Sequence, residues 1–287
     1  MATFYNQATL SYNGNVRSSN VTTGQIIEVL SASKNAVQDN YSPDNDVVFV
    51  VSIINNGNTA FNNITVTDNL GSYTLAGSTA DVVPLTYVVD SVNFYVNGVL
   101  QNAPTVSDTN PLTIENINVP ANSNALIVYA AKPNQFAPLG TDGSITNRAV
   151  VSGNNFADIP VEETITPNNT ADLTISKSLS PTEVQENGEV TYTFVIENYG
   201  NTASVPADNV IFRDVFSPVL DSLTAVFNGT SWAEGTNYSY DSTTGEFVTL
   251  NGQIEVPAAQ FTQDAQTGVW SVQPGVSTLV IKGNIQS

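Results

Sequence analysis

Short runs in which apolar and polar residues alternate recur along the whole chain. Four clear examples are residues 46–54 (DVVFVVSII), 63–70 (NITVTDNL), 91–100 (SVNFYVNGVL) and 125–131 (ALIVYAA). A period of two places successive side chains on opposite faces, which is typical of half-buried strands. Asn, Gly, Pro and Asp punctuate the runs, and no window holds a helical period long enough to compete. The pattern predicts an all-β chain built as antiparallel β-sandwiches.

The second half of the chain repeats the motifs of the first half in the same order. VSIINNGNTA at 51–60 corresponds to FVIENYGNTA at 194–203, and a strand with an aspartate follows each of them. A polar, turn-rich joint at 167–169 separates the halves. The expected organisation is an N-terminal extension at 1–22, a first sandwich domain at 23–167 and a second sandwich domain at 168–287.

These motifs resemble the repeat family called domain of unknown function 11, found in bacterial surface and spore-appendage proteins. The most specific parts are the N-x-G-N-T-A turn, the aspartate strand after it, and ITNRAVVS at 145–152. The resemblance covers nearly the whole chain. It implies two tandem Ig-like antiparallel β-sandwich domains at an extracellular location, on a cell or spore surface, and it implies no enzymatic activity.

Charge and residue inventory narrow the function further. A formal net charge of −19 repels a phosphate backbone or an anionic membrane, so we expect no nucleic-acid partner and no membrane insertion. The chain has no cysteine and no histidine, which excludes serine–histidine triads, thiolate nucleophiles and imidazole or thiolate metal sites. We therefore expect a protein that is not an enzyme and that uses no metal and no cofactor.

The second domain lacks a strand that the first one has. After residues 125–131 the first domain continues into ITNRAVVS at 145–152, whereas the second domain stops a few residues past its TLVIKGN motif at 278–284. A sandwich without that strand exposes an apolar groove and an unpaired edge.

The N-terminus begins without the basic and apolar regions of a signal peptide, so we expect either that a leader is absent or that export follows another route.

The N-terminus offers the missing strand. FYNQATLS at 4–11 aligns without gaps on ITNRAVVS at 145–152. The residues expected to face inward are Phe4, Asn6, Ala8 and Leu10. Inserted into the second domain of a neighbouring molecule, this donor strand would give a head-to-tail homopolymer. Alternatively, it folds back onto its own second domain, pairs with the first domain as an edge strand, or frays.

Each domain places a lysine and an aspartate on an apolar strand face. Residues two apart share a face, so Lys34 and Asp68 point inward in the first domain, and Lys177 and Asp214 point inward in the second. By the same rule Asn147 points inward. Buried charges are expensive, so their recurrence needs a reason.

One reason is an isopeptide bond, in which a desolvated neutral lysine attacks an asparagine amide polarised by a protonated aspartate and ammonia leaves. This predicts a Lys34–Asn147 link within one chain and a Lys177–Asn6 link between neighbours, with Asp68 and Asp214 as the catalysts. The alternative is unlinked Lys–Asp ion pairs. Two further asparagines that point inward by parity compete as lysine partners or serve as turn residues; they are Asn55 and Asn198.

The leading interpretation is a structural subunit of a self-assembling extracellular filament or spore appendage, whose principal partner is a second copy of itself. Any protein that anchors it to a surface is not identifiable from the sequence. The alternative is a surface adhesin that binds a glycan or a protein. That alternative rests on aromatic residues able to stack on a sugar, which are Trp232, Tyr238, Tyr240 and Trp270.

Overall fold

The computed structural model describes residues 2–26, 29–43 and 45–286, which form strands β1 to β28 and one short 3-10 helix, η1 (Pro206–Asp208). The chain divides into two compact units. The first unit contains residues 1–73, 83–134 and 145–165, and the second contains 74–82, 135–144 and 166–287. Three segments of the predicted first domain thus belong to the second unit; they are residues 74–82, 135–144 and 166–167. No helix among the described residues is long and apolar enough to cross a membrane.

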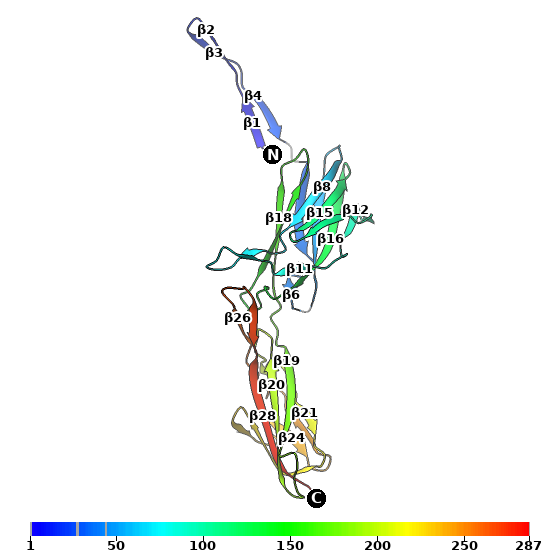
Figure 1. The fold of residues 1–287 in the computed structure, drawn as a ribbon, viewed down its shortest axis with the longest axis vertical. Helices are drawn as coiled ribbons and strands as arrows, with labels where there is room; N and C mark the ends of the chain where they lie inside the picture. The colour runs from blue at the N-terminus through cyan, green and yellow to red at the C-terminus, as the bar shows by residue number, and fades with distance from the viewer. Residues whose placement is uncertain (1, 27–28, 44, 287) are drawn as a thin grey trace. The chain divides into compact units, whose positions relative to one another are not determined.

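The first unit is a sandwich of two large sheets (Figure 1). One sheet contains, in spatial order, β13 (Val99–Leu100), β12 (Asn93–Val96), β16 (Ser123–Pro133), β7 (Val47–Asn55) and β5 (Leu30–Ala36), with β11 (Leu85–Tyr87) also paired to β16. The other contains β14 (Thr105–Thr109), β15 (Leu112–Val119), β8 (Phe61–Asp68), β17 (Ile145–Ser152), β18 (Ile159–Pro167) and β6 (Asn40–Tyr41).

The core of the first sandwich follows the period of two in its strands. Along β7, side chains alternate between buried and half-buried, so that Phe49, Val51 and Ile53 all point into the core. Phe49 stacks on Tyr129 from β16, with ring centroids 5.7 Å apart. The opposite sheet contributes Ile64 and other fully buried aliphatic side chains. This alternation confirms the strand pattern that the sequence predicts.

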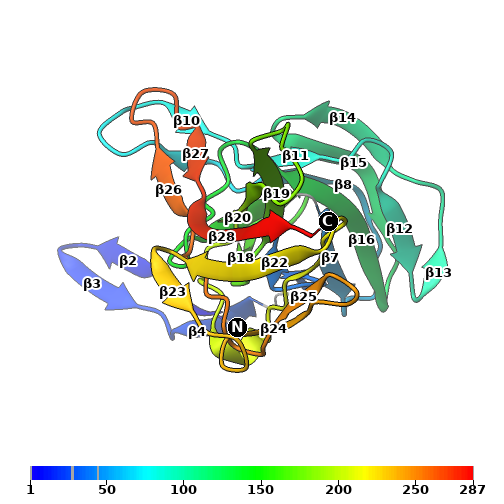
Figure 2. The same cartoon turned by 90° about the horizontal axis from the view of Figure 1, so that it is seen from below.

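The second unit is a sandwich of unequal sheets (Figure 2). Its large sheet contains β19 (Leu173–Ser180), β20 (Glu189–Asn198), β28 (Gly275–Ile285), β22 (Leu220–Phe227) and β23 (Thr230–Trp232). The small sheet contains β21 (Arg213–Val215), β25 (Glu246–Thr249) and β24 (Tyr238–Asp241). Four further strands form two-stranded sheets, in which β9 (Tyr73–Thr74) pairs with β10 (Asp81–Val82) and β26 (Gln260–Gln263) pairs with β27 (Trp270–Gln273). The architecture confirms the predicted fold class of two tandem Ig-like antiparallel sandwiches.

The N-terminal residues form a separate ribbon of four short strands, which are β1 (Ala2–Asn6), β2 (Thr9–Tyr12), β3 (Asn15–Ser18) and β4 (Thr22–Ile26). Among the described strands, β1 pairs only with β4 and β2 only with β3. The N-terminal ribbon thus pairs with neither sandwich among the described strands.

The same asparagine turn closes one end of each sandwich. In the first, Asn55 Nδ2 donates to the carbonyl oxygens of Thr59 and Pro120, both at 2.8 Å, and its Oδ1 accepts from the Gly57 N–H at 2.9 Å. Asn198 makes the corresponding bonds in the second sandwich, with its Nδ2 on the carbonyls of residues 202 and 257 and its Oδ1 on the N–H groups of residues 172 and 200. These asparagines are turn residues whose amides are already engaged.

We expect Asn55→Ala to lower the unfolding free energy of the first sandwich by about 1–3 kcal/mol, because buried backbone groups lose their partner. The adjacent exposed Asn56→Ala is the matched control, with a change within about 0.5 kcal/mol. Urea titration of each variant measures the difference. Equal effects would contradict the role of the Asn55 amide.

Candidate functional site

A lysine and an aspartate lie side by side in the core of the first sandwich. Lys34 comes from β5 and Asp68 from the end of β8, in opposite sheets, because both follow the inward alternation of their strands. Lys34 Nζ donates to Asp68 Oδ2 at 2.5 Å, and both side chains are fully buried. A charged pair taken this far from water needs further polar partners to be stable.

Those partners are present around the aspartate. The Leu70 N–H donates to Asp68 Oδ1 at 2.7 Å, and the Tyr129 hydroxyl donates to Asp68 Oδ2. Lys34 Nζ also lies 5.0 Å from the centroid of the Phe49 ring. Burial lowers the pKa of Lys34 despite the opposing effect of the Asp68 charge, and burial raises the pKa of Tyr129. The lysine is thereby biased toward the neutral amine.

Asn147 lies in the same polar cluster. It sits in the middle of β17, is fully buried, and its Oδ1 accepts from the Gly71 N–H at 3.2 Å. Burial raises the pKa of Tyr129, and the Asn147 side chain acts in the opposite direction and lowers it. Among the described residues Asn147 Nδ2 has no hydrogen-bond partner. A buried amide N–H₂ without a partner is costly, in contrast to the fully bonded amide of Asn55.

The backbone donor to Asn147 depends on a glycine. Gly71 has φ of +74°, a conformation that favours glycine, and a Cβ there would lie against Ile145 Cγ2. The tight turn after β8 therefore brings an N–H toward the Asn147 carbonyl. An N–H on that oxygen stabilises negative charge that develops there when a nucleophile attacks Cγ.

The polar cluster has the parts needed for amide exchange. A neutral Lys34 amine can attack Asn147 Cγ to form an Nζ–Cγ bond, the Cγ–Nδ2 bond breaks, and Nδ2 leaves as ammonia. Asp68 accepts from the amine and can take the proton that the amine loses, while the departing nitrogen takes up one proton to leave as ammonia. Sequence reasoning identified these three residues by parity but missed Tyr129 and Gly71.

The second sandwich holds an equivalent pair in an open setting. Lys177 Nζ, from β19, donates to Asp214 Oδ2, from β21, at 2.6 Å. The lysine also lies 4.7 Å from the centroid of the Tyr192 ring. The side chains are 43% and 21% exposed, so these residues do not share the full burial of the first pair. The expected inward burial of Lys177 is therefore incomplete in the isolated chain.

Strand register shows which residues of the two sandwiches correspond. Lys34 is opposite Val51 and Lys177 is opposite Phe194, so Phe49 corresponds to Tyr192, two residues earlier. Tyr129 lies opposite Phe49 in the first sandwich, and Ile281 lies opposite Tyr192 in the second. The second pair thus has an isoleucine where the first has the tyrosine hydroxyl.

An apolar groove opens beside the second pair. It has a volume of about 400 Å³, and its principal lining residues are Leu173, Ile175, Lys177, Phe194, Val210, Phe212, Asp214 and Ile254. Ile175 is 56% exposed although its strand position faces inward. The whole of β19 is exposed or half-buried, whereas β5 has buried positions at Leu30 and Lys34. We refer to this feature as the acceptor groove.

The acceptor groove lies where β17 would be. In the first sandwich β17 pairs with β8, with Ala149 opposite Asp68 and Val151 opposite Val66. In the second sandwich β21 corresponds to β8, and among the described strands it pairs only with β25. It is also shorter, three residues against eight. In the described part of the chain, the second sandwich therefore has no counterpart of β17 beside β21.

The predicted donor residues lie in the N-terminal ribbon. Phe4 and Asn6 belong to β1, Leu10 belongs to β2, and Ala8 lies in the break between those strands. All four are exposed, with Phe4 at 54% and Leu10 at 66%. A two-stranded ribbon with apolar side chains in water is marginal by itself. Asn6 is thus exposed to solvent and is not bonded to Lys177 in the single chain.

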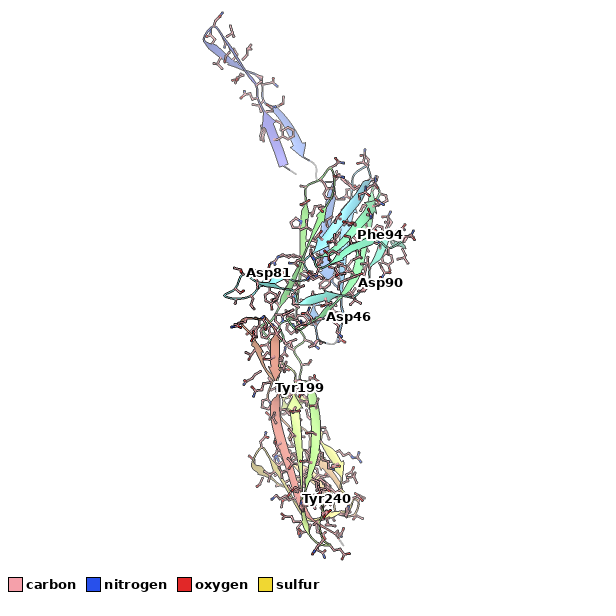
Figure 3. All side chains as sticks on the ribbon, viewed as in Figure 1. Asp46, Asp81, Asp90, Phe94, Tyr199 and Tyr240 are labelled. Atoms are coloured by element: carbon pink, nitrogen blue, oxygen red, sulfur yellow. The ribbon has the colours of Figure 1, made fainter. Side chains whose placement is uncertain are left out.

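Three of the four aromatic residues considered for sugar stacking, which are Trp232, Tyr238 and Tyr240, are engaged in packing, whereas Trp270 Nε1 is buried without a hydrogen-bond partner among the described residues. Trp232 stacks on Phe227 with centroids 4.8 Å apart. Tyr238 stacks on Phe247 at 4.6 Å. The hydroxyl of Tyr240, a residue labelled in Figure 3, accepts a hydrogen bond from the Leu220 N–H and donates one to the Leu220 carbonyl. Packing therefore accounts for Trp232, Tyr238 and Tyr240.

Comparison with known proteins gave structural likeness only. The chain matches no protein-family model and no curated protein sequence, so the resemblance to domain of unknown function 11 stays a prediction. Among solved structures it is similar to the major pilin BcpA of Bacillus cereus, with 10% identity, a TM-score of 0.37 and coverage of 95% of this chain and 73% of that chain.

Two other matches are of the same order. The pilus backbone protein RrgB of Streptococcus pneumoniae shows 12% identity and a TM-score of 0.33, over 85% of this chain and 55% of that one. The collagen-binding subdomain of the Enterococcus faecalis surface protein ACE shows 8% identity and a TM-score of 0.31, and the match covers 50% of this chain and 100% of that chain. Likeness at this level does not transfer a function from one chain to another.

The contrast in burial between the two lysines predicts a contrast in stability. Lys34→Met should lower the unfolding free energy of the first sandwich by about 3–5 kcal/mol, because Asp68 is left buried without its hydrogen-bonded partner. Lys177→Met, at the solvent-exposed pair, should cost about 1 kcal/mol or less. Hydrogen exchange resolved by domain measures both. Similar losses in the two domains would contradict the difference in burial.

Proposed function

We propose that this chain is the structural subunit of a self-assembling extracellular filament or appendage on a cell or spore surface. Subunits join head to tail when the donor segment, residues 4–11, enters the acceptor groove of another copy. The observation that carries the proposal is the open groove beside Lys177, at the place that β17 fills in the first sandwich. Adding a strand to an open sheet edge is an established way of joining proteins.

The first sandwich supplies the register of insertion. Since Ala149 lies opposite Asp68, Ala8 would lie opposite Asp214 of the neighbour. By the same offset Leu10 would lie opposite Phe212, and Asn6 would take the place of Asn147 beside Lys177. The positions that template this face in β17 are all buried; they are Ile145, Asn147, Ala149 and Val151.

Charge is compatible with this join. Each copy carries a formal charge of −19, so two copies repel at long range. Residues 2–26 contain one charged side chain, Arg17, and no acidic residue. The segment that enters the neighbour is therefore free of the negative charge of the rest of the chain, and added salt should accelerate assembly by screening the remainder.

The contact is heterologous, because it joins one end of a subunit to a different surface of the next. Such a contact generates an open filament unless its rotation closes a ring. Each added subunit presents a new acceptor groove, so growth continues.

We further propose that isopeptide bonds make the filament covalent. Lys34 would bond to Asn147 within the chain, with Asp68 as catalyst, and Lys177 would bond to Asn6 of the neighbour, with Asp214 as catalyst. In each case the lysine amine replaces the amide nitrogen and one ammonia is released. What supports this is the buried Lys34–Asp68 contact at 2.5 Å and the Asn147 amide nitrogen that has no partner among the described residues.

Insertion of the donor segment predicts an alternating pattern of sensitivity. Phe4→Asp or Leu10→Asp should abolish filaments of the 287-residue chain, because these side chains enter the apolar groove. Tyr5→Asp and Thr9→Asp, on the other face, are the matched controls and should still assemble. Electron microscopy and sedimentation measure the outcome. A wild-type chain that remains monodisperse, or equal effects at all four positions, would overturn the donor arrangement.

The covalent step has a separate chemical test. Wild-type filaments boiled in detergent should give a ladder, and intact mass should show one ammonia lost for each bond. Lys177→Ala should remove the ladder yet keep reversible fibres, since strand insertion needs no bond. Lys34→Ala should keep the ladder and lose only the intrachain mass change. Boiled wild-type filaments that yield monomer of unchanged mass would leave a non-covalent polymer.

A further inference from the structure

The N-terminal ribbon has the same order of elements as the β17–β18 hairpin of the first sandwich. There, β17 turns into β18, which pairs along it from Ile145–Ile165 to Val151–Ile159, and the chain then enters β19. In the ribbon the donor segment turns into residues 15–26, which pair back along it, and the chain then enters β5. We call residues 15–26 the return strand.

Among the described strands, the second sandwich has no counterpart of either strand of that hairpin. Its small sheet ends at β21, whereas the matching sheet of the first sandwich continues through β17 to β18 and β6. One donor strand would fill only the position of β17. The neighbouring position, taken by β18 in the first sandwich, would stay open.

We propose that the ribbon docks as an intact two-stranded hairpin, the donor segment pairing with β21 of a second copy while the return strand stays paired and takes the place of β18. This rests on the proposed filament. The donor segment pairs with the return strand along one edge, and among the described strands its other edge is unpaired. That free edge is the one that would pair with β21 of the second copy. Docking then breaks none of the hydrogen bonds inside the ribbon.

A size exchange at one position supports this equivalence. Under the alignment of donor segment and β17, the pair Phe4–Gly24 corresponds to the pair Ile145–Ile165. Ile165 is fully buried in the first sandwich. A Cβ on Gly24 would fall within the Phe4 ring, so the larger ring occupies the space that a side chain at residue 24 would need. Cross-strand packing of an aromatic ring on glycine requires that the return strand remain paired.

The break in the donor segment does not interrupt its alternation. Between the pairs Asn6–Thr22 and Thr9–Ser18, two donor residues face three residues of the return strand. The extra residue therefore belongs to the return strand, as in a β-bulge. Ser19 holds the two strands together there, its N–H donating to the Ala8 carbonyl at 2.8 Å and its Oγ accepting from the Ala8 N–H at 3.0 Å.

A disulfide lock separates hairpin docking from single-strand docking. Tyr5 and Thr23 are directly opposed in the ribbon, and the chain has no native cysteine. Cross-strand pairs lie within disulfide reach. The double variant Tyr5→Cys and Thr23→Cys is oxidised as a monomer, and cross-linked dimers are then removed. The oxidised variant should assemble to the same extent and at the same rate as its reduced form. Assembly that is blocked when oxidised and restored by reductant would overturn the hairpin and leave the filament intact.

A rescue experiment gives a second, independent measurement. Gly24→Ile should reduce filament yield at least tenfold, because its side chain collides with the Phe4 ring. Adding Phe4→Ile recreates the Ile145–Ile165 pair and should restore most of the yield. Wild-type yield from Gly24→Ile alone, or no rescue by the double variant, would show that the return strand leaves the donor on docking. Wild-type chain that forms no filament would instead refute the proposed function itself.

Discussion

Burial of the Lys34–Asp68 pair is the constraint on which the rest of the structure depends. A lysine and an aspartate can lie in an apolar core only if strands cover them and polar groups satisfy them. In the first sandwich β17 provides the cover, and Tyr129 together with the backbone N–H of Leu70 provides the partners. Where that cover is absent, in the second sandwich, the lysine is partly exposed and the strand beside it is short.

This constraint links the two halves of the chain into one design. The chain has the N-terminal ribbon before the first sandwich and the β17–β18 hairpin before the second, so a two-stranded antiparallel unit precedes each sandwich in the sequence. The low charge of the N-terminal ribbon suits the proposed donor role in an otherwise acidic chain.

Much of the fold and part of the site could be predicted from the sequence, because both depend on alternation. Parity alone placed Lys34, Asp68 and Asn147 on the inner faces of their strands. Tyr129 was missed because a tyrosine among apolar residues reads as core, and its hydroxyl contact depends on how the two sheets face each other. The return strand was missed because VRSSNVTTGQ lacks alternation and is recognised only through its pairing with the donor segment.

The positions of Lys34 and Asn147 in the strand order have a mechanical consequence. Tension along a filament would enter the first sandwich through β5 and leave through the β17–β18 hairpin, so it would cross the fold between the strands that carry these two residues. A covalent link there would carry the load directly. The hydrogen bonds of the other strands would then be outside the path of force, and a stretched subunit would keep its sandwich folded.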